Sequence, residues 1–228
     1  MKTNIIFKTA ENYFYALSIL LCYPLYAIGQ LWLYIYDQKS DDFYLKINKF
    51  TSDWTNSHLL LLLSITLMIP AFVAINNFLN QDKINVWSKI SVFFISLSVV
   101  VLFGQFTIDL CLIEICKLPE NQAYQIIDNI QSNPIINALF YDNSQIFILF
   151  KFIDFALLSQ ITMGIALVKS KKMPKWALAL FFVALLITFF GILIHPVYGR
   201  IAKRFAYSLF SISFLPIAIS LINKNNSK

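Results

Sequence analysis

The chain has 228 residues, of which 58% are hydrophobic and 13% charged, and its formal net charge is +6. A soluble domain carries about 25% charged residues because its surface must be solvated, so this composition excludes an ordinary soluble globule. The excess of Lys and Arg favours a lipid bilayer with anionic headgroups as partner. It does not point to nucleic acid, because the basic residues are scattered and no RNA- or DNA-binding motif accompanies them.

Apolar residues are gathered into blocks that match a membrane-spanning helix of about 20 residues. The six blocks cover residues 13–36, 58–79, 86–115, 146–168, 176–196 and 205–222. The first follows Lys2 and Lys8 as the apolar part of a signal peptide would, but it is longer and no small-residue cleavage site follows it. We interpret it as a retained helix. The sequence therefore predicts an all-α, polytopic membrane helix bundle of about six transmembrane helices in a single domain.

Two segments between the blocks are long enough for structure of their own, residues 37–57 and 117–145. In the second, Ala123, Ile126, Ile127 and Ile130 recur at helical spacing, and Pro119 suits a first-turn position. We expect a short helix over residues 120–131. It would rest on the bilayer surface or cap the bundle.

The segment 169–175 contains four lysines, and short loops rich in Lys and Arg stay in the cytoplasm. This places both termini in the cytoplasm, with ten Lys inside and seven Lys or Arg outside, which is a modest bias. The outer side then includes a basic cluster of Arg200, Lys203 and Arg204 without acidic neighbours. Either the orientation is inverted or this cluster meets an anionic group.

Ionisable side chains inside a membrane are costly, so each is a functional hypothesis. Those within or ending the predicted spans all fall in the outer half: Asp109, Glu114, Lys151, Asp154 and His195. They approach the Arg200 loop and His58, which opens the second span. We expect them to form an outward-facing polar pocket. Gln105 joins the candidates because Ser91, Ser98, Gln105, Asp109 and Cys116 share one face of the third predicted span.

The candidate ligand-binding residues are therefore Asp109, Glu114, Lys151, Asp154, His195, Gln105 and Arg200. Structural alternatives stay open for most of them. Lys151 and Asp154 are three residues apart and can pair along one helix. Glu114 and His195 lie near span ends, where water reaches them. Asp109 is the hardest to explain as a solvated group.

The sequence lacks HExxH, GxSxG, P-loop and glycine-rich dinucleotide motifs. Two histidines are too few for a multi-histidine zinc site, and Cys22, Cys111 and Cys116 do not have metal-ligand spacing. We predict no catalytic residues, no metal site and no cofactor, and we consider an enzyme the less favoured class.

The segment from Gly164 to Gly191 reads GIALVKSKKMPKWALALFFVALLITFFG. Its order, a span, a basic turn and then Pro-Lys-Trp opening the next span, resembles a broad group of uncharacterised bacterial six-span membrane proteins. The resemblance implies a six-span fold and brings no catalytic residues with it. The abundance of Asn, Lys, Ile and Phe is typical of AT-rich bacterial genomes, so we expect a bacterial cytoplasmic membrane.

The leading functional hypothesis is binding of a small molecule, ion or lipid headgroup in the outer pocket, in a transporter-like or sensory role. One alternative is an intramembrane hydrolase that uses His195 and the carboxylates. Another is a non-catalytic partner subunit of a membrane complex. The oligomeric state stays open.

Overall fold

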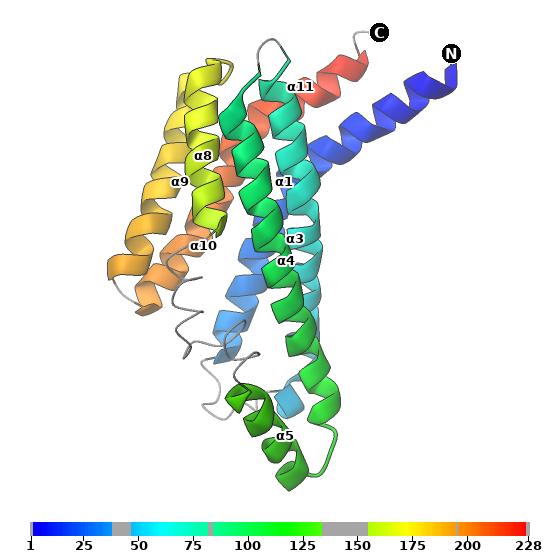
Figure 1. Ribbon diagram of the computed structural model, residues 1–228, viewed down its shortest axis with the longest axis vertical. Helices are drawn as coiled ribbons and strands as arrows, with labels where there is room; N and C mark the ends of the chain where they lie inside the picture. Colours follow the sequence, from blue (N-terminus) through cyan, green and yellow to red (C-terminus); the bar gives the residue numbers. More distant parts are fainter. Residues whose placement is uncertain (1, 38–46, 82–83, 134–154, 195, 227–228) are drawn as a thin grey trace.

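The computed structural model describes residues 2–37, 47–81, 84–133, 155–194 and 196–226, and this part of the chain forms helices and turns without a strand (Figure 1). The predicted all-α class is confirmed. The helices are α1 (Lys2–Asp37), α3 (Thr51–Leu79), α4 (Val86–Ile115), α5 (Glu120–Ser132), α8 (Phe155–Ser170), α9 (Lys175–Ile194), α10 (Pro196–Ser213) and α11 (Leu215–Asn226).

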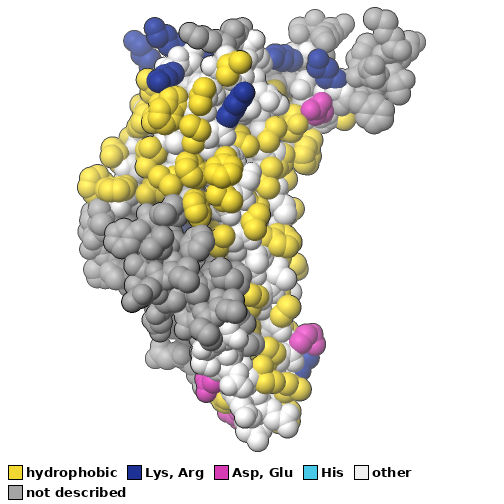
Figure 2. Space-filling model, viewed as in Figure 1, with side chains coloured by type: hydrophobic (Ala, Val, Ile, Leu, Met, Phe, Trp, Pro, Cys, Tyr) yellow, Lys and Arg dark blue, Asp and Glu magenta, His cyan; other side chains and the backbone are white. Residues whose placement is uncertain are grey.

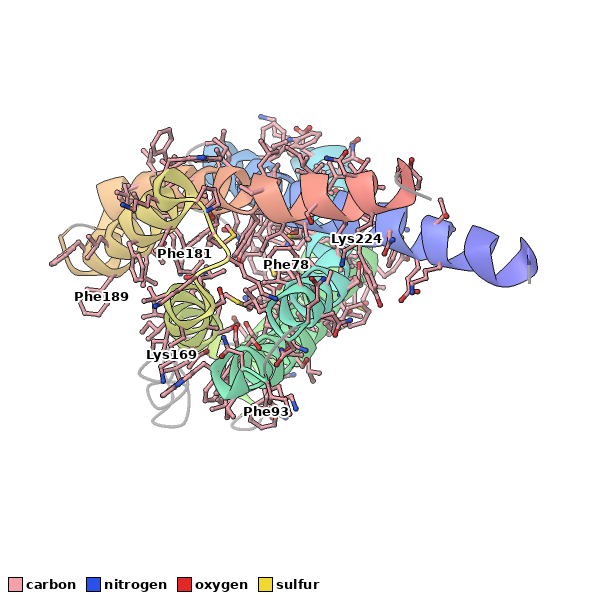
Figure 3. The ribbon with its side chains drawn as sticks, turned by 90° about the horizontal axis from the view of Figure 1, so that it is seen from above. Phe78, Phe93, Lys169, Phe181, Phe189 and Lys224 are labelled. Carbon is pink, nitrogen blue, oxygen red and sulfur yellow. The ribbon has the colours of Figure 1, made fainter. Side chains whose placement is uncertain are left out.

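Helices α1, α3, α4, α8, α9 and α10 alternate in direction along one elongated bundle (Figure 1). As a result, both termini and the Lys-rich turn between α8 and α9 lie at one end, whereas α5 lies at the other (Figure 1). Seen from the end with the termini, Phe181 points into the bundle, whereas Phe93 and Phe189 point away from it (Figure 3). Aromatic side chains therefore both fill the core and cover the outside.

The face of the bundle drawn in Figure 2 carries apolar side chains along much of its described length. Large side chains such as Leu63, Phe93 and Val100 are half-exposed or more, which a water-facing surface does not tolerate over a large area. Four helices of the described residues are long and apolar enough to cross a membrane, over Lys8–Leu33, Thr51–Leu79, Val86–Ile115 and Ile201–Lys224. The structure thus supports a multi-pass membrane protein.

The predicted count of about six spans is not confirmed, because α8 and α9 contribute only shorter apolar helices, Phe155–Ser170 and Lys175–Phe190. The fourth predicted span began at residue 146, and residues 146–154 lie outside the described part.

The third predicted span, residues 86–115, coincides with α4. The last prediction, 205–222, differs, because helix begins at Pro196 and breaks between α10 and α11. Pro216 lacks an N–H for the carbonyl four residues earlier, which accounts for a break there.

The helix expected over 120–131 is present as α5. Its apolar side packs onto the ends of α3 and α4, where Ala123 and Ile127 join Trp54, Leu112 and Cys116 in a buried cluster. Of the two arrangements expected for this helix, this packing corresponds to the one in which it caps the bundle.

Two glycines allow helices to approach closely. A Cβ on Gly29 of α1 would lie 2.8 Å from Cγ of Leu61 and 3.2 Å from the carbonyl oxygen of Ser57, both on α3. A Cβ on Gly164 of α8 would lie 3.0 Å from the Phe181 ring of α9. Small residues at such crossings increase van der Waals contact between the helices. This contact drives helix association in a bilayer, where apolar lipid tails leave no hydrophobic driving force.

Serine hydroxyls connect helices through backbone carbonyls. Ser91 of α4 donates to the carbonyl of Ser159 at 2.7 Å, and Ser159 of α8 donates back to the carbonyl of Ser91 at 2.8 Å. In the same way, Ser211 of α10 donates to the carbonyl of Leu20 in α1 at 3.0 Å. Each bond satisfies a polar side chain that hydrocarbon could not solvate.

Candidate functional site

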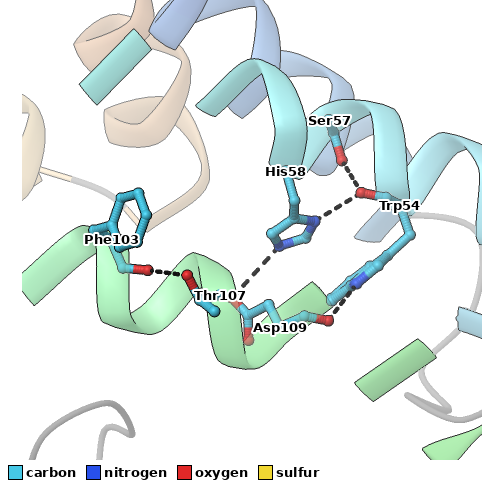
Figure 4. Close-up of polar contacts among 6 residues, drawn as sticks. All are labelled: Trp54, Ser57, His58, Phe103, Thr107 and Asp109. Carbon is cyan, nitrogen blue, oxygen red and sulfur yellow. Dashed lines mark hydrogen bonds and ion pairs between the residues drawn. The ribbon is translucent and has the colours of Figure 1, made fainter. Parts of the chain in front are cut away.

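The most informative polar contact in the described part of the chain joins α3 to α4 near the end of the bundle that α5 covers (Figure 4). His58, in the second turn of α3, places Nε2 3.4 Å from Oδ2 of Asp109, which lies nearly two turns before the end of α4. The side chains are 2% and 17% exposed. A charged group so deeply enclosed requires a partner, and each residue provides one for the other.

The hydrogen bond of the other ring nitrogen of His58, Nδ1, shows which nitrogen carries a hydrogen when the ring is neutral. Nδ1 lies 2.8 Å from the carbonyl oxygen of Trp54, one turn earlier on α3. The Ser57 hydroxyl donates to the same oxygen at 2.9 Å. A carbonyl oxygen can only accept, so Nδ1 must carry a hydrogen. Neutral His58 would then present a lone pair at Nε2, toward the Asp109 carboxyl.

Two protonation states are compatible with this contact. Either His58 is an imidazolium beside the Asp109 carboxylate, or neutral His58 accepts a hydrogen from protonated Asp109. If a neutral imidazole faced an ionised carboxylate, two hydrogen-bond acceptors, Nε2 and Oδ2, would point at each other. The contact is therefore attractive only in a state in which the imidazole Nε2 or the carboxyl group carries a hydrogen.

Trp54 fixes the geometry of the pair from two directions. Its indole Nε1 donates to the backbone carbonyl of Asp109 at 2.9 Å, which ties α3 to α4 at the level of the carboxyl group. Its ring lies 4.4 Å from the His58 ring, and the Phe106 ring meets His58 edge-on at 6.0 Å. These apolar faces keep water from the imidazole and strengthen its interaction with the carboxyl group.

Neighbouring polar groups of α4 are directed elsewhere. Thr107 is exposed, and its hydroxyl donates to the carbonyl of Phe103 in the same helix at 2.7 Å (Figure 4). Glu114 is also exposed and pairs with Lys117 three residues later. The structure thus places this candidate on an exposed surface, where its partner is Lys117. Gln105 is half-buried one turn before Asp109.

Several candidates lie outside the described residues, namely Lys151, Asp154 and His195, and so does the side chain of Arg200. The predicted convergence of these groups with Asp109 stays a prediction. Of the contacts expected around Asp109, the structure describes the one with His58.

Sequence reasoning underrated His58 and did not connect Trp54, which it read as an aromatic anchor at the membrane interface, with this site. A signal for both was present, because a Trp and a His four residues apart lie on the same helix face at the level of an aspartate on the next helix.

The described residues contain no group of three or more His, Cys, Asp or Glu side chains close enough to hold a metal ion. The three cysteines are free thiols. Burial raises the pKa of the Cys116 thiol, which packs beneath α5 beside Trp54, so Cys116 stays protonated at neutral pH.

Comparisons with protein-family models, with curated proteins and with solved structures find no match for this chain.

Proposed function

We propose that the protein is a six-span membrane protein with both termini in the cytoplasm, and that it binds a small ligand in response to protonation of the His58–Asp109 pair. Its role is that of a proton-linked transporter or a pH sensor. The alternating helices and the shared end of the two termini support an even number of passes (Figure 1). The Lys-rich turn at that end supports the orientation.

The single observation that carries the proposal is the His58–Asp109 contact with Nδ1 held by a carbonyl. Because the pair needs one proton to remain attractive, losing it turns the link between α3 and α4 into a repulsion. A two-state link of this kind converts proton binding into helix movement.

Trp54 offers an optical test. An imidazolium quenches indole fluorescence more strongly than a neutral imidazole does, and the two rings are 4.4 Å apart. The emission of purified protein is recorded from about pH 4 to pH 9, a range that spans ordinary His and carboxyl titration. Subtracting the Trp54→Phe spectrum removes the contributions of Trp32, Trp87 and Trp176.

In wild type we expect a pH-dependent Trp54 component. Asp109→Asn keeps a hydrogen-bonding group of the same shape but removes the negative charge that favours the imidazolium. The component should therefore disappear or change its pH dependence. Glu114→Gln removes an exposed carboxylate from the same helix and should leave the component unchanged. If wild type and Asp109→Asn give the same curve, the pair is a fixed cross-link and the proposal is wrong.

A further inference from the structure

Two polar atoms inside the bundle have no hydrogen-bond partner among the described residues, namely the hydroxyl of Tyr23 on α1 and Oε1 of Gln160 on α8. Tyr23 is 2% exposed and Gln160 is 3% exposed, so bulk water reaches neither atom. Apolar side chains and lipid tails cannot replace the hydrogen bonds that water would offer, and a buried polar group without them is costly. Each atom therefore requires a partner that the described chain does not supply.

The two side chains meet in the interior of the bundle, although their helices pack mainly on other neighbours. Helix α1 packs on α3, α10 and α11, whereas α8 packs on α4 and α9. Nevertheless, the Gln160 side chain lies beside Tyr23. Because the Tyr23 hydroxyl and Oε1 of Gln160 both lack a hydrogen bond, the two side chains are neighbours without a direct bond between these atoms.

Contacts with other helices hold both side chains in place. The Tyr23 ring stacks on the Tyr207 ring of α10, with 5.9 Å between the ring centroids. Ser159 exchanges hydrogen bonds with Ser91 of α4, which sets the rotation of α8. Successive residues of an α-helix lie about 100° apart around its axis, so Gln160, the next residue, is turned from this contact toward the interior. The packing on α4 and α10 therefore opposes a closer approach of the hydroxyl and the amide.

We propose that one water molecule binds between Tyr23 and Gln160 and joins α1 to α8. The Tyr23 hydroxyl donates to the water oxygen, and the water donates to Oε1 of Gln160. A buried water makes about two to four hydrogen bonds, so these two partners suffice to hold it. Water fits this position better than a larger solute, because Met163, one turn after Gln160, and Phe210, whose ring meets that of Tyr23, are fully buried apolar side chains.

The direct test is a crystal structure of the full chain, grown from a lipid phase, at a resolution that shows ordered water. In wild type we expect density for one water about 2.5–3.0 Å from both the Tyr23 hydroxyl and Oε1 of Gln160. Tyr23→Phe keeps the ring but removes one of the two partners, so the density should disappear. Tyr15→Phe is the matched control, because it removes from the same helix a hydroxyl whose partner is Glu11, and the density should remain.

Infrared spectroscopy of the protein in lipid gives an independent measurement. A water held by only two partners in apolar surroundings should give an O–H stretching band of weakly hydrogen-bonded water, which moves to lower frequency when ordinary water is exchanged for H₂¹⁸O. Wild type and Tyr15→Phe should show this isotope-sensitive band, and Tyr23→Phe should lose it. If Tyr23→Phe does not purify as folded protein, Gln160→Met replaces it with the same expectation, because it removes the other partner.

The proposal is overturned if the wild-type density shows Tyr23 bonded directly to Gln160 with no water between them. It is equally overturned if the water density or the infrared band is the same in Tyr23→Phe as in wild type. All these variants leave Trp54, His58 and Asp109 unchanged, so the fluorescence test of the proton pair is decided separately.

Discussion

Pro24 leaves a carbonyl of α1 without its usual helical partner. A proline has no N–H, so the carbonyl of Leu20, four residues earlier, cannot form the regular helical bond. The structure supplies a replacement from another helix, because Ser211 donates to this oxygen at 3.0 Å. The proline and the serine therefore form one structural unit, although neither side chain bonds the other.

Ser211→Ala should lower the free energy of unfolding by about 0.5–2 kcal/mol, because it leaves the Leu20 carbonyl without a donor. In a Pro24→Ala background, the restored N–H of residue 24 satisfies that carbonyl, and the same serine substitution should then cost much less. Denaturation in mixed micelles measures both values. Ser208→Ala, on the same helix, is the control. Equal costs of Ser211→Ala in both backgrounds would contradict this account.

The sequence identified Asp109 as a group that needs a structural or functional reason, since a carboxyl well inside an apolar span is costly. It kept Glu114, five residues later, as a candidate for the same pocket although water was expected to reach it, and the structure places this side chain on the surface beside Lys117. Hydropathy reports depth along a helix, whereas the difference between these two carboxyls depends on which neighbour each helix face meets. That neighbour, His58, comes from a helix whose rotation a single sequence does not specify.

At the level of elements, Gly29 sets the distance between α1 and α3. The Leu61 side chain can move away from an added Cβ, but the Ser57 carbonyl belongs to the α3 backbone and cannot. A side chain at position 29 therefore forces the helices apart.

Gly29→Leu should destabilise the bundle by about 1–3 kcal/mol, the usual cost of overpacking, despite the better helix propensity of leucine. Gly29→Ala should be destabilising by less. Gly104→Ala on α4 serves as the control, because it brings the same propensity gain of about 1 kcal/mol. Thermal unfolding in one detergent compares the variants. Our interpretation fails if substitutions at positions 29 and 104 have the same effect.

Helix bounds were predictable where the local sequence itself marks the beginning and the end of the helix. Residues 86–115 form one predominantly apolar run that contains no proline, and α4 occupies that range. The start of the last helix was harder to predict, because Arg200, Lys203 and Arg204 give the first turns of α10 a polar sequence. Tyr26 and Gln30 of α1 line the same cavity as Lys203 and Arg204, and hydropathy alone does not reveal these polar neighbours.

At the scale of the whole molecule, the described residues at the two ends of the bundle differ in charge. The end with both termini carries the Lys-rich turn, and Figure 2 shows Lys and Arg gathered there. The end that α5 covers shows Asp and Glu side chains, with a basic side chain beside one of them (Figure 2). A bundle that spans the membrane must expose these ends to different compartments.

A variant without native cysteines allows each end to be labelled separately. Lys117→Cys marks the α5 end and Lys175→Cys marks the Lys-rich turn, and both positions are exposed. A membrane-impermeant maleimide should label position 117 in intact cells, but position 175 only after the membrane is opened. The reverse pattern would invert the proposed orientation. Labelling of both positions in intact cells would contradict a membrane-spanning bundle.

The Leu20–Ser211 bond also bears on how the protein is made. Its two residues are 191 positions apart, so the first helix leaves the ribosome long before its hydrogen-bond donor has been translated. During this interval the Leu20 carbonyl is in the insertion machinery or the bilayer without its final partner. The hydrogen bonding of α1 is therefore complete only after α10 has been synthesised. We expect chains truncated before residue 211 to engage membrane chaperones longer than full-length chains do.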